Sequence, residues 1–279
     1  MLYVHPAGIR KTRPARDTRV QLQRRTQMNL PAPTAARIAA HRLAAHDHAI
    51  PMTSRQTEAP SQHSVAVCAV DVPTSVPRTE TTPRLAGHGV DCHRGSLDDV
   101  LDRYTQAARR YGAQHVVRLT GDCPLMDADL VDRGLEELAR GDADYVGNST
   151  PPSFPDGLDV ECFTMAALET AWREARRPSE REHVTPYIRN GGSGLRVRNW
   201  RGVADFSALR WTVDHPDDLV HVQDLVQAHF AAVGKPVAAT GFDRFDLMRV
   251  LETREVAPPG QHMRNEGYAK SLAAEAGKV

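Results

Sequence analysis

The sequence predicts an α/β fold in which a mainly parallel sheet carries helices on both faces. Short apolar runs of the kind that form buried strands alternate along the chain with segments whose apolar residues recur at helical spacing. The chain has 279 residues, which is enough for one sizeable α/β domain. Alternating strands and helices place the helices in the connections between parallel strands, where they cover the sheet.

The chain divides into three parts by composition. Residues 1–60 are rich in Arg, Ala, Thr, Pro and His and lack a sustained period of 2 or 3.6, so we expect a poorly ordered basic segment. Asp17 is the only acidic residue before position 45. Residues 61–235 have the pattern of a globular domain, and residues 236–279 are expected to form a C-terminal helical extension.

Five apolar runs are predicted to be strands. Each is short and contains β-branched, aromatic or other apolar residues, and the first of them is bounded by Pro73. The second ends shortly before Gly121. The predicted strands are residues 65–70, 116–119, 144–147, 160–163 and 195–200.

Four helices are predicted from periodicity and from their ends. Ser96 is expected to cap the first, because a hydroxyl oxygen accepts from free N–H groups and the acidic residues after it suit the helix dipole. The second is expected to stop at Gly141 and the last to begin at Pro216. The predicted helices are residues 97–108, 130–138, 165–176 and a long segment from 216.

Charge and cysteine usage exclude several classes of protein. Lys plus Arg and Asp plus Glu both number 35, so the net charge gives no reason to expect binding to nucleic acid or to an anionic membrane. No apolar run approaches the roughly 20 residues of a membrane span. The 4 cysteines form no C-x-x-C pair, so we expect reduced thiols in a cytoplasmic protein, without a disulfide framework or a cysteine-based zinc site.

The first candidate site follows the strand at residues 116–119. Asp122 comes just after Gly121, where the chain turns away from the sheet. In open α/β sheets, ligands lie outside the carboxyl ends of the strands, and a carboxylate there suits Mg²⁺, which prefers oxygen ligands. The alternative is that Asp122 only stabilises a turn. The spacing leaves both interpretations open.

The second candidate is Asp214, which ends another apolar stretch just before the helix that starts at Pro216. Two carboxylates at strand ends could share one metal ion and the phosphates that it binds. The alternative is that Asp214, together with Asp217 and Asp218, serves the N-terminus of the following helix.

A third group of polar residues lies in two segments, 154–161 and 180–187. Side chains of these types could form hydrogen bonds with the hydroxyls of a sugar. The alternative is an ordinary Pro-Asp-Gly turn followed by a solvated helix start. The candidates are Asp156, Asp159, Glu161, Arg181, Glu182 and His183.

Taken together, these segments resemble the cytidylyltransferases related to spore coat polysaccharide biosynthesis protein F, whose relatives activate acylneuraminic and deoxyoctulosonic acids. The resemblance covers residues from about 65 to 279, and its ordered motifs are more specific together than any one alone. The matching segments are residues 93–104, 118–125, 154–161, 179–188, 209–219 and 264–272.

The resemblance implies a glycosyltransferase-A-like nucleotide-binding fold and a specific reaction. A sugar or sugar acid would attack the α-phosphate of CTP, giving a CMP-sugar and pyrophosphate for surface polysaccharide or glycan biosynthesis. By matching position, Asp122 and Asp214 would be the catalytic carboxylates that bind Mg²⁺. Arg118 and Gly121 would belong to the substrate-binding motif, and the third group of polar residues would face the sugar. A homodimer stays open.

The start of the chain departs from the family pattern. Members open with a buried strand and a glycine-rich basic loop that wraps the triphosphate, whereas residues 7–16 lack both the glycine spacing and a preceding apolar strand. A reading-frame error in a GC-rich gene, or loss of the nucleotide loop, would explain this. We therefore expect weak or absent turnover from this chain.

Two other functions stay open at this level. A glycosyltransferase of the same fold would consume a preformed nucleotide sugar rather than release pyrophosphate from CTP. A non-catalytic remnant, with the basic head contacting nucleic acid, would show salt-dependent retention on DNA. The head needs no function, so binding to nucleic acid is the least favoured of these.

Overall fold

The computed structural model describes residues 2–4, 67–73, 91–233, 244–253, 256 and 261–277. Apart from residues 2–4, the predicted basic segment at 1–60 lies outside the described residues, and so does the stretch 7–16 that departs from the family's nucleotide-binding loop.

Within the described residues, the sheet has seven strands in the order β3-β2-β1-β4-β6-β5-β7. All five predicted strands are present with ends shifted by at most three residues, because apolar runs mark a strand better than its limits. The strands are β1 Leu2–Val4, β2 Val67–Pro73, β3 Asp91–Gly95, β4 His115–Arg118, β5 Tyr145–Gly147, β6 Glu161–Thr164 and β7 Val197–Asn199.

The α/β class is confirmed, but the expectation of a mainly parallel sheet is wrong. Among the described strands, only β2 with β3 and β5 with β7 pair in parallel, whereas β6 runs antiparallel to both β4 and β5. A parallel connection needs a crossover, usually a helix, and residues 148–160 between β5 and β6 contain none. The chain therefore returns in the opposite direction, and β6 lies between β4 and β5.

The expectation that no strand precedes residue 7 is also wrong. Residues Leu2–Val4 form β1, which lies between β2 and β4 and pairs antiparallel with both. The first residues thus enter the sheet beside the strand that leads to Asp122.

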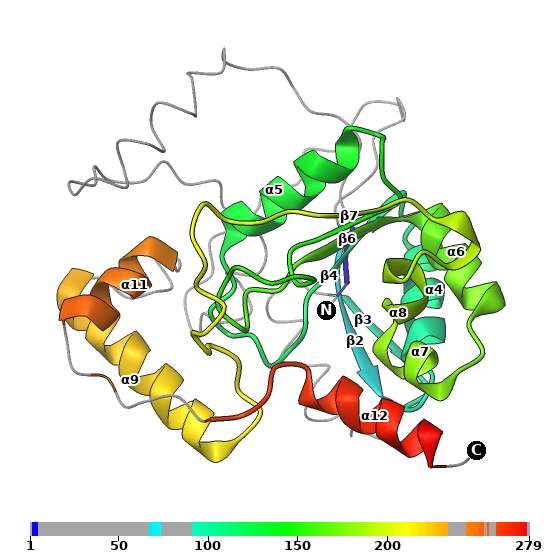
Figure 1. Cartoon of the computed structure of the whole chain (residues 1–279). Coiled ribbons are helices and arrows are strands. Elements are labelled where there is room, and N and C mark those ends of the chain that lie inside the picture. Colours follow the sequence, from blue (N-terminus) through cyan, green and yellow to red (C-terminus); the bar gives the residue numbers. More distant parts are fainter. Residues whose placement is uncertain are drawn as a thin grey trace.

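Helices flank both faces of the sheet (Figure 1). In Figure 1, α5, α9 and α11 lie on one side of the sheet, and α4, α6, α7 and α8 lie on the other. The helices are α4 Val100–Arg110, α5 Ala128–Ala139, α6 Met165–Glu174, α7 Pro178–His183, α8 Pro186–Arg189, α9 Pro216–Val233, α11 Arg244–Thr253 and α12 Glu266–Ala276, with a 3₁₀ turn η1 at Gly192–Gly194.

The two faces of the sheet contribute to two separate hydrophobic cores. Along β4, Val116 packs into the core that contains α4 and α6, and Val117 packs into the core that contains α5, α9 and α11. Along β6, Phe163 packs into the same core as Val116, and Cys162 packs into the same core as Val117. Successive side chains of a strand point to opposite faces, so helices are required on both sides to bury them.

The first predicted helix begins later than its proposed cap. Asp99, not Ser96, caps α4, because its carboxylate accepts from the N–H of Asp102 at 3.0 Å. Ser96 instead accepts from the N–H groups of Asp98 and Asp99 in the preceding turn, both at 3.2 Å. The hydroxyl therefore stabilises the approach to the helix rather than its first turn.

Two helices of the C-terminal part pack against the rest of the fold. Leu247 and Val250 of α11 are buried in the same core as α9. At the base of the molecule in Figure 1, α12 contacts α7. None of the helices in the described part of the chain combines the length and apolarity that crossing a membrane requires.

Candidate functional site

A cavity of about 410 Å³ lies beyond the end of β4. Its wall is formed by the end of β4 and the turn after it, the segment 149–161, the last residues of α7 and α8, the segment 212–215 before α9, and the start of α12. Its lining residues are Arg118, Thr120, Asp122, Cys123, Ser149, Asp156, Asp159, Glu161, His183, Arg189, Thr212, Asp214, His215, Asn265, Glu266, Gly267, Tyr268 and Lys270.

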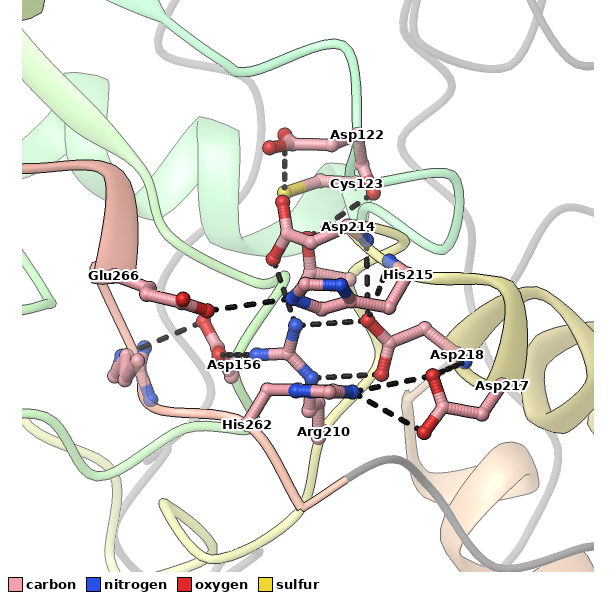
Figure 2. A network of polar contacts seen from close by, with 12 residues as sticks. Asp122, Cys123, Asp156, Arg210, Asp214, His215, Asp217, Asp218, His262 and Glu266 are labelled. Atoms are coloured by element: carbon pink, nitrogen blue, oxygen red, sulfur yellow. Dashed lines mark hydrogen bonds and ion pairs between the residues drawn. The ribbon is translucent and has the colours of Figure 1, made fainter. Parts of the chain in front are cut away.

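Asp122 and Asp214 lie beside each other at this cavity (Figure 2). The carbonyl oxygen of Asp122 accepts from the N–H of Val213 at 2.8 Å, which ties the turn after β4 to the residue before Asp214. The hydroxyl of Thr212 donates to the same oxygen at 3.3 Å. Asp122 and Asp214 thus line one cavity on segments that are tied together, whereas a shared role in binding Mg²⁺ stays a prediction.

Cys123 acts as a hydrogen-bonding group in the turn that carries Asp122. Its Sγ lies 3.0 Å from the Thr120 hydroxyl and donates to Asp122 Oδ1 at 3.4 Å. Burial, together with the negative charge of Asp122, raises the pKa of the Cys123 thiol well above its usual value. The thiol therefore stays protonated and orients the carboxylate, rather than serving as a nucleophile.

Arg210 is the centre of a network of four charged groups (Figure 2). It donates to both carboxylate oxygens of Asp218, each at 2.8 Å, to Asp156 Oδ2 at 2.8 Å and to Asp214 Oδ2 at 2.7 Å. Its side chain is only 7% exposed, so these contacts are largely shielded from water. One guanidinium thus fixes Asp214 relative to the segment that carries Asp156.

Asp218 has two roles in this network. Besides pairing with Arg210, its Oδ2 accepts from the N–H groups of Asp214 and His215, both at 3.1 Å. These bonds hold the segment that leads into α9. The sequence already offered this role for Asp218, as a residue that serves the N-terminus of the helix. The hydrogen bonds from Arg210 lower the pKa of Asp218 from its usual 3.8 to about 2.

The lowered pKa of Asp218 predicts an acid-dependent loss of stability. Ionised Asp218 stabilises the fold fully above pH 3.8, and this contribution is lost as the pH falls toward 2, where the folded protein takes up the proton. The contribution corresponds to about 2 kcal/mol. We expect the unfolding free energy of the wild-type chain to drop by that much more between pH 5 and pH 2 than that of Asp218→Asn. Equal drops in denaturant titrations would contradict this assignment.

Asp156 and Asp159 line the cavity but are already paired with basic side chains. Arg264, from the segment before α12, donates to Asp159 Oδ1, and its Nε lies 3.6 Å from Asp156 Oδ1. Burial raises the pKa of Asp159 to about 6 even though Arg264 opposes the shift. The sequence predicts that both carboxylates face a sugar. In the structure they form ion pairs with Arg210 and Arg264 that connect the segments around the cavity, and the contact with a sugar stays a prediction.

Glu161 lines the cavity and is also a buried charge centre, and its expected contact with a sugar stays a prediction. Its carboxylate accepts from Arg118 at 2.5 Å and from Tyr145 and Thr185 at 2.7 Å each. Burial alone would raise its pKa, but Arg118 and the two hydroxyl donors outweigh this and lower it, with help from Arg189. The ionised Glu161 thereby holds the guanidinium of Arg118 at the cavity wall.

Three predicted residues are not among the described residues that line this cavity: Gly121, Arg181 and Glu182. Arg181 donates to Asp99 Oδ2 at 2.6 Å and to the carbonyl of Trp172 at 2.8 Å, so it joins α7 to α4 and α6. These bonds direct the guanidinium toward the helices, and the expected contact of Arg181 with a sugar stays an untested prediction. Glu182 accepts from Ser271 at 2.8 Å and is about half exposed.

His183 does line the cavity. Its Nε2 lies 2.9 Å from the Ser271 hydroxyl, and its ring meets Tyr268 edge-on with 5.2 Å between centroids. Burial lowers its pKa, and the charges of Arg118 and Arg189 act in the same direction. The imidazole is therefore neutral at pH 7 and can either donate or accept a hydrogen bond.

Comparison with known proteins decides the family. The model of the family described as cytidylyltransferase matches residues 51–230, which is more than half of the chain. The chain belongs to the cytidylyltransferase family. The resemblance found in the sequence is thereby confirmed, and the family match covers β2 to α9, including every candidate residue of the site.

Two curated proteins are similar to parts of this chain. An uncharacterized protein of Methanocaldococcus jannaschii is 45% identical over 100 residues, which are 36% of this chain and 40% of that protein. Spore coat polysaccharide biosynthesis protein SpsF of Bacillus subtilis is 29% identical over 154 residues, which are 53% of this chain and 63% of that protein. The chain thus matches less than two thirds of the length of either relative.

A solved structure supports the fold. The structure of a cytidylyltransferase from Leptospira borgpetersenii serovar Hardjo-bovis matches with a TM-score of 0.60 and 26% sequence identity. The match covers 70% of this chain and 79% of that chain. This match confirms that the present chain has the nucleotide-binding α/β fold that the resemblance implied.

The donor set at Asp122 and Asp214 fits the divalent ion that the family resemblance implies. Asp122 and Asp214 both line the cavity, and so do Thr120 and Thr212, all of which carry side-chain oxygens. Mg²⁺ prefers oxygen ligands and keeps several waters, so two carboxylates at the edge of a polar cavity suit it. No nitrogen or sulfur ligand is needed from the chain.

Sequence reasoning missed the contribution of the C-terminal segment. The first turn of α12 lines the cavity through Glu266, Tyr268 and Lys270, although residues 264–272 had been assigned only to the family resemblance. Arg210 was missed as well. The available signal was a charged residue inside an apolar strand-like run, since such a residue is rarely buried unless it is paired.

Proposed function

We propose that this chain is a nucleotidyltransferase that joins CTP to a sugar or sugar acid, with Mg²⁺ as its cofactor, and releases pyrophosphate. The observation that carries the proposal is the placement of Asp122 and Asp214 side by side at one polar cavity beyond the end of β4. Membership of the cytidylyltransferase family supports the nucleotide, and similarity to the spore coat polysaccharide protein supports a sugar acceptor for surface polysaccharide.

The reaction proposed is an in-line displacement at phosphorus. A sugar hydroxyl forms a new bond to the α-phosphate of CTP while the bond to the bridging oxygen breaks, so pyrophosphate leaves and the hydroxyl proton is lost. Mg²⁺ bound by Asp122 and Asp214 would neutralise phosphate charge and help to align the attack. The chain itself contributes mainly positioning and electrostatics.

Three side chains in or beside the cavity have a specific role in this proposal. Arg118, held by ionised Glu161, presents a fixed positive charge suited to a phosphate or a sugar carboxylate. Neutral His183 can form a hydrogen bond with a sugar hydroxyl. Arg210 keeps Asp214 at a set position next to Asp122, because the same guanidinium is held by buried Asp218.

Titration calorimetry with CTP tests the proposal. We expect the wild-type chain to bind CTP more tightly with Mg²⁺ than without it, and Asp122→Asn to lose this difference because one of two metal carboxylates is gone. Asp205→Asn is the matched control, since Asp205 is 58% exposed and pairs only with nearby surface residues. If Asp122→Asn retains the full Mg²⁺-dependent affinity, Asp122 has no part in metal binding.

A second assay separates this proposal from its rivals. Pyrophosphate release from CTP and a sugar acid supports nucleotidyl transfer, whereas consumption of a preformed nucleotide sugar supports a glycosyltransferase.

Free thiols at Cys92, Cys123 and Cys162 support a reducing compartment, and we place the reaction in the cytoplasm.

A further inference from the structure

Two histidines and a glutamate form a cluster beside the proposed nucleotide site. His215 precedes α9, and His262 and Glu266 come from the segment that leads into α12. One ligand atom from each of the three residues lies within 4.8 Å of the others. Tertiary structure alone unites them, since more than 40 residues of chain separate His215 from its partners.

The contacts within this cluster set up nitrogen and oxygen donors. His215 Nε2 lies 3.3 Å from Glu266 Oε2, and the His215 and His262 rings stack with 3.7 Å between centroids (Figure 2). Lys270 holds the other carboxylate oxygen of Glu266, Oε1, at 2.5 Å. Oε2 therefore remains directed at His215.

Asp217 orients one of the histidines. Its two carboxylate oxygens lie 3.1 and 3.2 Å from His262 Nε2, so this nitrogen carries the proton and donates it to the carboxylate. The lone pair of His262 is then on Nδ1, the ring nitrogen away from Asp217 (Figure 2). A carboxylate that fixes the tautomer of a histidine in this way is typical of metal-ligating histidines.

The cluster is accessible to ions from solution. The side chains of His215, His262 and Glu266 are 33%, 29% and 31% exposed, and His215 and Glu266 also line the cavity. Two imidazoles and one carboxylate favour a borderline ion such as Zn²⁺ over Mg²⁺, which prefers oxygen ligands alone. The donor chemistry thus differs from that of the site at Asp122 and Asp214.

We propose that His215, His262 and Glu266 form a binding site for a Zn²⁺-class ion that joins the start of α9 to the C-terminal segment. Ligand atoms in a zinc site lie about 2.0–2.2 Å from the ion, so binding draws the three donors closer together and opens the stack of the two rings. Because Glu266 begins the wall formed by α12, the ion would fasten that wall next to Asp214.

Zinc titration of the full chain after chelator treatment tests this site, with one variant for each part of it. We expect His262→Ala and Glu266→Gln to weaken the binding of one Zn²⁺ at least tenfold. Asp217→Asn leaves all three ligands in place but removes the carboxylate that orients His262, so we expect a loss of about tenfold. Co²⁺ gives a second readout, because nitrogen ligands in a site of low coordination number intensify its visible absorption.

Two control variants separate this inference from the proposed function. Glu252→Gln changes an exposed carboxylate on α11 and is expected to leave Zn²⁺ affinity unchanged. Asp122→Asn is expected to lose Mg²⁺-dependent CTP binding and to keep Zn²⁺ binding, so either proposal can fail alone. Wild-type Zn²⁺ affinity and stoichiometry in His262→Ala, or in Glu266→Gln, would overturn the three-residue site.

Discussion

Replacing Arg210 with methionine is expected to lower the free energy of unfolding by about 3–5 kcal/mol. The substitution leaves the carboxylate of Asp218, whose side chain is 0% exposed, without the guanidinium that pairs with both of its oxygens. Asp156 loses a partner at the same time. A buried charge deprived of its partner is far more costly than the loss of an exposed ion pair.

Denaturant titration monitored by circular dichroism measures this effect. Arg201→Met is the matched control, because Arg201 pairs with Asp205 at 3.4 Å and both side chains are more than half exposed. We expect that control to cost no more than about 0.5 kcal/mol. The double variant Arg210→Met with Asp218→Asn should lose less than the two single variants combined, since it removes both ends of the buried pair. A cost for Arg210→Met as small as that of Arg201→Met would refute the central role of Arg210.

Gly157→Ala is expected to cost about 3 kcal/mol or more, the second largest effect. Gly157 has φ +101°, a conformation that residues with a Cβ rarely adopt. A Cβ there would lie 2.6 Å from the carbonyl carbon of Trp211 and 2.7 Å from the backbone nitrogen of Thr212. Backbone atoms cannot rotate away, so the segment carrying Asp156 must separate from the segment carrying Arg210.

Gly141→Ala isolates the part of this cost that is due to backbone conformation. Gly141 follows α5 with φ +77°, and a Cβ there would meet nothing within 4 Å. We expect about 1–2 kcal/mol from the left-handed conformation alone. Thermal or denaturant unfolding measures the loss of unfolding free energy in each variant. The difference between the two losses is the cost of the close approach of the segments at Gly157. Similar losses in the two variants would mean that the approach of the segments contributes little.

Both predictions concern the same structural junction. Asp156 donates its N–H to the carbonyl of Leu209 at 2.8 Å and accepts from the N–H of Trp211 at 2.7 Å, so the two segments pair as a short bridge. Gly157 permits this approach and Arg210 adds the ionic contacts. The position of Asp214 in the cavity depends on this junction, because Asp214 follows Arg210 by four residues and binds it directly.

Much of the fold could be predicted because the decisive signals are local. The apolar run at residues 116–119 gives β4, Pro216 starts α9, and Gly141 follows the end of α5. Asp122 and Asp214 could be proposed as partners, since both follow apolar stretches. Asp122 does follow β4, whereas the expected strand before Asp214 is reduced to the isolated bridge of Arg210 with Asp156. The direction of β6 could not be predicted, because apolar periodicity is the same for a strand that runs either way.

The candidate site was only partly predictable because the side chains that fix it come from distant parts of the chain. Glu161 and Arg181 carry polar groups that would suit a sugar, yet Glu161 pairs with Arg118, 43 residues away, and Arg181 pairs with Asp99, 82 residues away. Arg264 meets Asp159 across 105 residues. Nothing in the neighbouring sequence of these residues indicates which partner each will find.

The sequence by itself determined the α/β class, the family and the two carboxylates proposed to bind Mg²⁺, because these depend on residue order within short segments. Tertiary structure decided the antiparallel direction of β6 and the partner that each polar side chain binds. It also decided that α12 lines the cavity. Strand direction and charge pairing depend on which segments meet in space, and a buried charge remains stable only beside the partner that packing brings to it.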